Sequence, residues 1–190
     1  MNLFLSRLIS TSFALFALML GGCGYHLGSG MVPLPYRTVT VPIVGEDEDG
    51  RFTDSLIRHL SSSGRFEYRY NEADLILFVC LQNLRHEHIG YRYDRNKEGK
   101  LVKSVIPTET RLKLAAKVTL VESCTGCVIR GPVFIEASVD YDHDWYTSRD
   151  QINQFSLGQV TDYDLASETA LTPLSDRLSE KIVDYLMYAW

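Results

Sequence analysis

The chain has 190 residues, with 19 basic residues against 24 acidic ones and a net charge of −5. A nucleic-acid-binding protein of this size is normally basic, so the composition excludes that class and predicts no nucleic acid among the partners. The length suits one hydrophobic core, and a single domain is therefore expected.

The first 22 residues carry one charge, Arg7, and an apolar run over residues 8–20 that ends in two glycines and Cys23. A membrane span needs about 20 apolar residues, so this shorter run predicts a signal peptide over residues 1–22. Leucine, two small residues and cysteine resemble a bacterial lipobox, which implies that Cys23 is acylated. The alternative is an ordinary signal peptide or a lone anchor with an incidental cysteine.

The residue after Cys23 is Gly24 and not an aspartate. By resemblance to the usual bacterial sorting signal, this favours the outer membrane over the inner one. Several acyl chains on one residue anchor a protein stably, so outer-membrane lipid is an expected partner through Cys23. Residues 23–35 are rich in Gly and Pro and predict a lipidated tether ahead of a single domain over residues 36–190.

The first elements of that domain follow in quick succession. Val39, Val41 and Ile43 alternate with polar residues and predict a half-buried strand. Apolar residues at helical spacing over 52–60 predict an amphipathic helix, with Gly64 as its C-terminal cap. A short alternating strand is expected over residues 66–70.

The next segment is continuously apolar from residue 75 to residue 81, which predicts a strand buried on both faces and makes Cys80 a core residue. Residues 83–107 are polar and form the one locally basic stretch of an acidic chain. With a turn expected at residues 94–99, we predict that the strand extends beyond the core and returns as an exposed hairpin.

Apolar residues occupy every second position over residues 112–120 and again over residues 133–141, which predicts two further strands. Between residues 166 and 186 they recur every fourth position, which predicts a long helix that includes Pro173. The predicted core includes Leu112, Leu114, Val118, Val133, Ile135, Leu178 and Ile182. These elements predict an α+β, two-layer sandwich: a mostly antiparallel sheet of four to five strands with two helices on one face.

Two pairs of residues are candidates for a chemical role. Cys124 and Cys127 lie between two predicted strands, where a local disulfide or a solvated turn is expected, since no second pair completes a zinc site. His86 and His88 share one face of a strand but have no obvious third metal ligand. No nucleophile or phosphate-binding motif is found. The sequence therefore favours a binding or structural protein without metal, cofactor or catalytic residues over an enzyme.

Several segments together resemble the LptE family of lipopolysaccharide-assembly lipoproteins. The resemblance is carried by residues 23–27, 38–43, 56–60, 73–77 and 182–186. It implies an α+β protein inside the lumen of a β-barrel partner, LptD, where it plugs the barrel, supports its assembly and contacts lipopolysaccharide. The implied location is the outer membrane, facing the periplasm or the lumen of the barrel. No enzymatic activity is implied.

The basic hairpin offers candidates for contact with lipopolysaccharide, because phosphates bind Lys and Arg. Tyr91 and Tyr93 lie among these basic residues and add apolar rings. The candidate ligand-binding residues are Arg85, Arg92, Arg95, Lys97, Lys100 and Lys103. The alternative interpretation of this segment is a solvated hairpin with ordinary surface charges. For the whole protein, the alternatives are a peptidoglycan-binding envelope scaffold and a periplasmic hydrolase.

Overall fold

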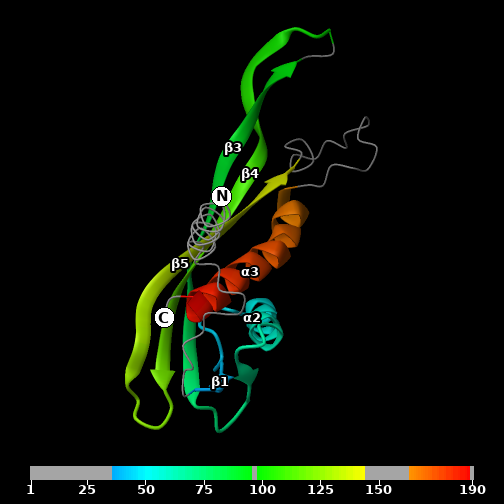
Figure 1. Ribbon diagram of the computed structural model, residues 1–190. Helices are drawn as coiled ribbons and strands as arrows, with labels where there is room; N and C mark the ends of the chain where they lie inside the picture. Colours follow the sequence, from blue (N-terminus) through cyan, green and yellow to red (C-terminus); the bar gives the residue numbers. More distant parts are fainter. Residues whose placement is uncertain (1–35, 96–97, 144–162, 189–190) are drawn as a thin grey trace, which may run out of the picture. The chain divides into compact units, whose positions relative to one another are not determined.

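A computed structural model describes residues 36–95, 98–143 and 163–188. The predicted signal peptide and tether lie outside these residues. The described residues form two helices packed on one face of an open, five-stranded sheet (Figure 1). The predicted α+β, two-layer class is therefore confirmed, and the sheet has the larger of the two expected strand numbers.

The sheet is built mainly from three long strands, β3 (Leu75–Arg95), β4 (Leu101–Glu122) and β5 (Val128–Asp142). They pair antiparallel in chain order. Two short strands, β1 (Thr38–Thr40) and β2 (Glu67–Tyr68), complete the sheet in the order β2-β1-β3-β4-β5. β1 runs parallel to both of its neighbours, so the sheet is mixed but mostly antiparallel.

The helices cover only one side of this sheet. Helix α2 (Arg51–Ser62) ends as predicted, with Gly64 at a φ of 67° just beyond its C-cap. Helix α3 (Tyr163–Tyr188) continues through Pro173. Both helices turn their apolar residues toward the same sheet face, where Leu56, Leu60, Leu178 and Ile182 are fully buried.

The predicted core is largely confirmed. Leu112, Leu114, Val118, Leu178 and Ile182 are buried. Val133 and Ile135 of β5 are only partly buried, although they pack against the core. The reason is that β5 is an edge strand, which has a neighbouring strand on one side only.

Two predictions about burial are wrong. The β3 segment over residues 75–81 is not buried on both faces: Phe78 is 47% exposed, and Cys80 is half-buried on the side away from the helices. Ile43 is also exposed, because β1 ends at Thr40. Phe78 and Cys80 lie on the sheet face that no helix covers, and Ile43 lies just beyond the end of β1.

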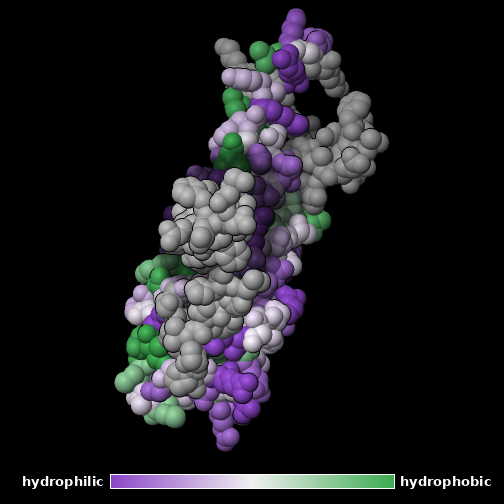
Figure 2. All heavy atoms as spheres, in the orientation of Figure 1, coloured by the Kyte–Doolittle hydropathy of each residue, from purple (hydrophilic) through white to green (hydrophobic). Residues whose placement is uncertain are grey.

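The uncovered face is not uniform. Exposed hydrophobic residues, including Phe78, Val128 and Phe134, lie toward the end where β4 turns into β5. Figure 2 shows hydrophobic surface gathered at that end, whereas the opposite end, formed by the β3–β4 hairpin, mixes hydrophilic residues with exposed Tyr91, Tyr93 and Leu101. The two ends of the sheet therefore differ in surface chemistry.

Candidate functional site

The predicted extension of the β3–β4 hairpin is present in the structure. Past the last residues paired with β5, the two strands continue as a ribbon from Gly90 to Arg95 and back from Leu101 to Pro107 (Figure 1). Figure 1 shows this ribbon projecting beyond both helices. Among the described strands, only β3 and β4 contribute to this ribbon.

The ribbon places Tyr91 and Tyr93 on one face and Arg92 on the other. Residues directly opposite each other in an antiparallel pair share a face, and successive residues alternate. Tyr91 lies opposite Pro107 and Tyr93 opposite Val105, which places these four residues on one face. Arg92 lies opposite Ile106 on the other face. The predicted combination of charge and rings therefore takes the form of a two-faced ribbon.

The remaining basic candidates are gathered near the turn. Arg95 donates a hydrogen bond of 2.8 Å to the Gly99 carbonyl and so helps to close it, and Lys100 is exposed beside it. Lys97 lies outside the described residues. Lys103 belongs to β4, but its side chain lies outside the described part. Residues 91–103 contain five basic and two acidic residues, so this end is locally positive in an acidic chain.

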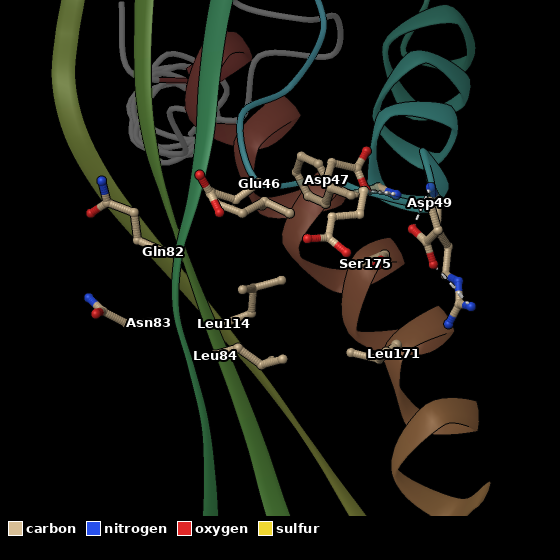
Figure 3. A pocket seen from close by; sticks show the side chains of 13 residues that line it. Glu46, Asp47, Asp49, Gln82, Asn83, Leu84, Leu114, Leu171 and Ser175 are labelled. Carbon is tan, nitrogen blue, oxygen red and sulfur yellow. Dashed lines mark hydrogen bonds and ion pairs between the residues drawn. The ribbon is translucent and has the colours of Figure 1, made fainter. Parts of the chain in front are cut away.

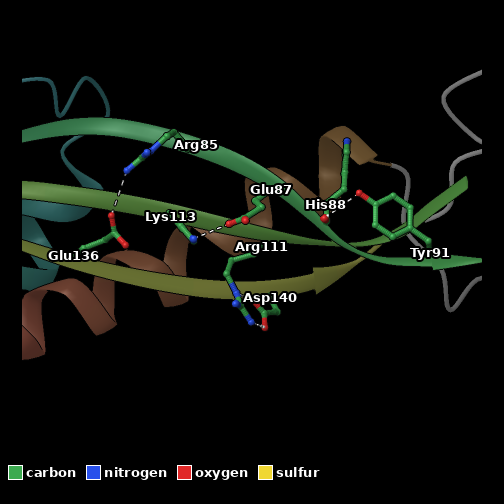
Figure 4. A network of polar contacts seen from close by, with 8 residues as sticks. All are labelled: Arg85, Glu87, His88, Tyr91, Arg111, Lys113, Glu136 and Asp140. Carbon is green, nitrogen blue, oxygen red and sulfur yellow. Dashed lines mark hydrogen bonds and ion pairs between the residues drawn. The ribbon is translucent and has the colours of Figure 1, made fainter.

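Arg85 belongs to a different part of the protein. It lies on the uncovered face of the sheet body, where its Nη2 is 3.4 Å from Glu136 Oε2. Two more ion pairs continue across the same face: Lys113 with Glu87 at 2.6 Å, and Arg111 with Asp140 through two contacts of 2.7 Å (Figure 4). Arg85 already has an acidic partner, so the structure does not bring it together with the basic residues of the turn.

Two of these ion pairs favour the charged form of their carboxylates, those of Glu87 and Asp140. The hydrogen bond from Lys113, followed by its charge, lowers the pKa of Glu87. The Arg111 guanidinium lowers the pKa of Asp140 in the same way, chiefly through its hydrogen bonds. Three cations and three carboxylates alternate across the strands, so the six side chains together carry no net charge. These three ion pairs therefore offer phosphate no net positive charge.

A cluster of imidazole and phenol rings lies where the ribbon leaves the body. His86 Nδ1 is 3.1 Å from Tyr163 Oη and 3.3 Å from Tyr141 Oη. Thr110 Oγ1 is 2.9 Å from both His88 Nδ1 and His143 Nε2. Burial is the main cause that raises the pKa of Tyr141 to about 12. The cluster links all three long strands to the start of α3, and it therefore holds the base of the ribbon against the body.

Other candidate chemistry receives no support from the geometry. Cys124 and Cys127 are both free and exposed in the β4–β5 turn, which agrees with a solvated turn and not with a disulfide. In the described ranges, no three His, Cys, Asp or Glu side chains are grouped to hold a metal ion. Among the same residues, no helix has the length and apolar character needed to cross a membrane.

Sequence reasoning missed the acidic partners of the charged face, Glu87, Glu136 and Asp140. Glu136 and Asp140 alternate with apolar residues in β5, and this pattern indicates which face they share but not which residue lies opposite them. Cross-strand pairing depends on register, and β3 shifts its register between Gln82 and Arg85. No short-range signal in the sequence reports that shift.

The described residues thus form a two-layer fold in which the helices cover one face of the sheet and the β3–β4 ribbon projects beyond them. The family comparison is specific: the model of the LptE lipopolysaccharide-assembly family matches residues 36–186, and the chain belongs to this family. The LptE family is a non-enzymatic assembly factor. The predicted family is thus confirmed over nearly the whole domain.

Solved structures with a similar fold include lipoproteins. A minor lipoprotein from Acinetobacter baumannii is 14% identical and has a TM-score of 0.49, with 83% of this chain and 95% of that chain covered. The rare lipoprotein B from Shewanella oneidensis is 13% identical, with a TM-score of 0.46 and coverage of 79% and 93%. Because both TM-scores are below 0.5, the family assignment rests on the family model alone. No curated protein sequence matches the chain.

Proposed function

We propose that this protein is an outer-membrane lipoprotein, anchored through Cys23, that occupies the lumen of an LptD-type β-barrel and contacts lipopolysaccharide during its insertion. Membership of the LptE family supports a role in lipopolysaccharide assembly. The observation that supports the contact is the ribbon, which places a locally positive end beyond the helices of an acidic protein.

The chemistry of the ribbon suits this ligand. Lipopolysaccharide carries phosphates, which bind Arg and Lys, and acyl chains, which pack against exposed rings. Arg92 lies on one face of the ribbon, and Tyr91 and Tyr93 on the other. A ribbon of this kind can meet a charged headgroup on one side and either acyl chains or the barrel wall on the other.

The test is a charge reversal at Arg92, Lys97 and Lys100. Exposed charges contribute little to stability, so the variant is expected to fold with an unchanged melting temperature. It should lose binding to lipopolysaccharide or to the barrel. The matched control reverses three other exposed basic residues, Arg37, Arg69 and Lys117, which changes the net charge equally away from the ribbon. If both interactions survive at wild-type strength in the ribbon variant, the ribbon is ordinary solvated surface.

Partnership is tested separately by purifying the protein in detergent. A plug should co-purify with a large β-barrel protein of the LptD type, in an amount that does not depend on added lipopolysaccharide. If the chain is recovered with peptidoglycan and no barrel, the proposed partnership is wrong and an envelope scaffold replaces it.

The anchor is tested by the Cys23→Ser variant. Loss of acylation should release the protein from the membrane fraction and change the mass of the mature chain, because the acyl chains carry the membrane affinity. If the variant stays in the membrane fraction with an unchanged mature mass, Cys23 is not the lipidated residue.

A further inference from the structure

A cavity of about 540 Å³ opens between the sheet and the helices, away from the ribbon (Figure 3). Its size falls within the range of roughly 300–1,000 Å³ that is typical of binding pockets. β3 and β4 form one wall, and the loop before α2, the start of α2 and the middle of α3 form the others. The apolar lining residues are Phe52, Leu81, Leu84, Leu114 and Leu171.

The cavity lies beside an irregularity in β3. The register with β4 shifts between Gln82 and Arg85, and Asn83 has a left-handed φ of 57°. Figure 3 shows Leu84 directed to the same side as Leu114, facing Leu171 of α3, while Asn83 points away. The shift therefore adds a leucine to the helix side at a point where the helices do not cover it. Leu84 is left 48% exposed.

Acidic side chains border this apolar surface. Residues 46–49 supply four consecutive carboxylates to the lining, and Arg51 is the one basic residue of the lining. Asp47 accepts hydrogen bonds from Thr53 at the start of α2, and Asp49 pairs with Arg51 at 3.2 Å. Glu46 and Glu48 are both exposed. A phosphate or another anion would be repelled here. A cation attached to an apolar group would be attracted by the carboxylates, and its apolar part could pack against the leucine side chains.

The backbone next to the cavity favours a peptide over a small molecule. Gly45 bonds to the outer edge of β3, with its N–H to the Val79 carbonyl at 3.1 Å and its carbonyl to the Leu81 N–H at 2.9 Å. Beyond Leu81, none of the strands in the described ranges pairs with this edge of β3. An extended segment can add to such an edge through backbone hydrogen bonds, with its side chains in an adjacent pocket.

We propose that this cavity and the adjoining edge of β3 bind an extended peptide segment of a partner protein, in which apolar side chains are flanked by lysine or arginine. The apolar side chains enter the space bounded by Leu84, Leu114 and Leu171. A flanking cation lies against Glu46 and Glu48. This binding site is separate from the ribbon and does not depend on the proposed function.

The probe is the peptide acetyl-Lys-Val-Leu-Val-Lys-amide, titrated into the full chain at a fixed concentration of non-ionic detergent while amide shifts are followed by NMR. The matched peptide replaces both lysines with glutamate. We expect saturable shifts near Leu84 and Leu171 with the basic peptide and none with the acidic one. Higher salt should weaken the binding, because exposed charges are screened.

Three protein variants complete the design. Glu46→Gln combined with Glu48→Gln should weaken binding of the basic peptide roughly threefold to tenfold, as expected for the loss of two exposed charges. Glu67→Gln combined with Glu72→Gln removes the same charge from exposed positions outside the cavity and should leave binding unchanged. Leu84→Lys places a cation on the apolar wall and should abolish binding. Leu84 is half exposed, so this variant should keep the wild-type melting temperature.

The proposal is overturned by no saturable shift up to millimolar basic peptide, by equal binding of the acidic peptide, or by wild-type binding in the Leu84→Lys variant. Equal weakening by the two paired glutamine variants would also overturn it, since binding would then follow net charge and not the cavity. Binding of lipopolysaccharide by the ribbon is measured separately, so failure here leaves the proposed function standing, and the reverse also holds.

Discussion

Gly90 of β3 lies so close to Glu109 of β4 that a methyl group on Gly90 would come within 2.6 Å of the Glu109 Cβ. The contact falls where the register between the strands shifts and the ribbon begins. The methyl group would also come within 2.8 Å of the Glu109 Oε2, which can swing away, but the Cβ is fixed to the backbone, so one strand must move to accept it. Gly90 is therefore required for the close approach of the two strands at this point.

The first prediction follows from that contact. Gly90→Ala should loosen the ribbon locally, at a cost of about 1–3 kcal/mol in the opening of this segment. Hydrogen exchange should show faster exchange of amides in the ribbon, with little change in the body. Tyr91→Ala is the control, because it removes an exposed side chain next to Gly90 without a clash. Unchanged exchange in the Gly90→Ala variant would contradict the close approach.

The second prediction concerns Asp74, which precedes β3. Its carboxylate accepts hydrogen bonds of 2.9 Å from the backbone N–H groups of Arg37 and Thr38, and its own N–H donates to Thr38 Oγ1 at 2.8 Å. The hydrogen bonds from Arg37 and Thr38 lower the pKa of Asp74 below its ordinary value. Asp74→Ala leaves these donors without their acceptor and should cost about 1–3 kcal/mol at neutral pH.

The pH dependence of this effect has a definite sign. Since the folded-state pKa of Asp74 is lowered, its stabilisation is fully present above the ordinary carboxyl pKa and is lost as the pH falls through the lower, folded-state value. In urea unfolding, the stability difference between wild type and Asp74→Ala should therefore shrink at acid pH. A difference that stays constant from neutral to acid pH would show that the charge of Asp74 has no part in it.

The third prediction compares the two faces of the sheet. Leu112 is fully buried beneath the helices, whereas Phe134 is 64% exposed on the other face. Leu112→Ala should cost about 2–5 kcal/mol because it leaves a cavity. Phe134→Ala should cost less than about 1 kcal/mol in the isolated protein. Urea midpoints measure both changes, and equal costs would contradict a core that lies on one face only.

How far the sequence predicts this fold depends on the kind of pattern. Leu112, Leu114 and Val118 alternate with polar residues, and such a period identifies a strand together with its buried face. The apolar run over residues 75–81 lacks a period, so it could not show that Phe78 lies on an uncovered face. Burial there is decided by where the helices pack, which is a property of the whole fold.

The candidate site shows the same limit. The basic character of the ribbon can be predicted from the sequence, because Arg92, Arg95 and Lys100 lie within nine residues of one another. The pairing of Arg85 with Glu136, 51 positions away, cannot be predicted from the sequence, because it depends on the register of three strands. The cavity beside Leu84 depends on the same register shift in β3. Neither feature has a local signal that sequence reasoning could have used.

The last prediction concerns the free edge of the sheet. β5 is an edge strand of 15 residues, and unpaired backbone groups on such a strand can pair with another chain. Two basic side chains from α3 occupy part of this edge. Arg177 Nη1 donates a hydrogen bond of 3.0 Å to the Ser138 carbonyl, and Lys181 Nζ donates one of 2.8 Å to the Glu136 carbonyl.

The double variant Arg177→Ala and Lys181→Ala should therefore expose two edge carbonyls and allow the protein to associate with itself through β5. Analytical ultracentrifugation over a range of concentrations should show a larger sedimentation coefficient at high concentration. The control, Arg37→Ala with Lys117→Ala, removes the same charge from exposed positions off this edge and should sediment as wild type. Because both variants are more negative than wild type, repulsion alone would reduce association in each. If only the Arg177 and Lys181 variant associates, these two side chains prevent the β5 edge from pairing with another chain. If that variant stays monomeric at all concentrations, the β5 edge needs no such protection.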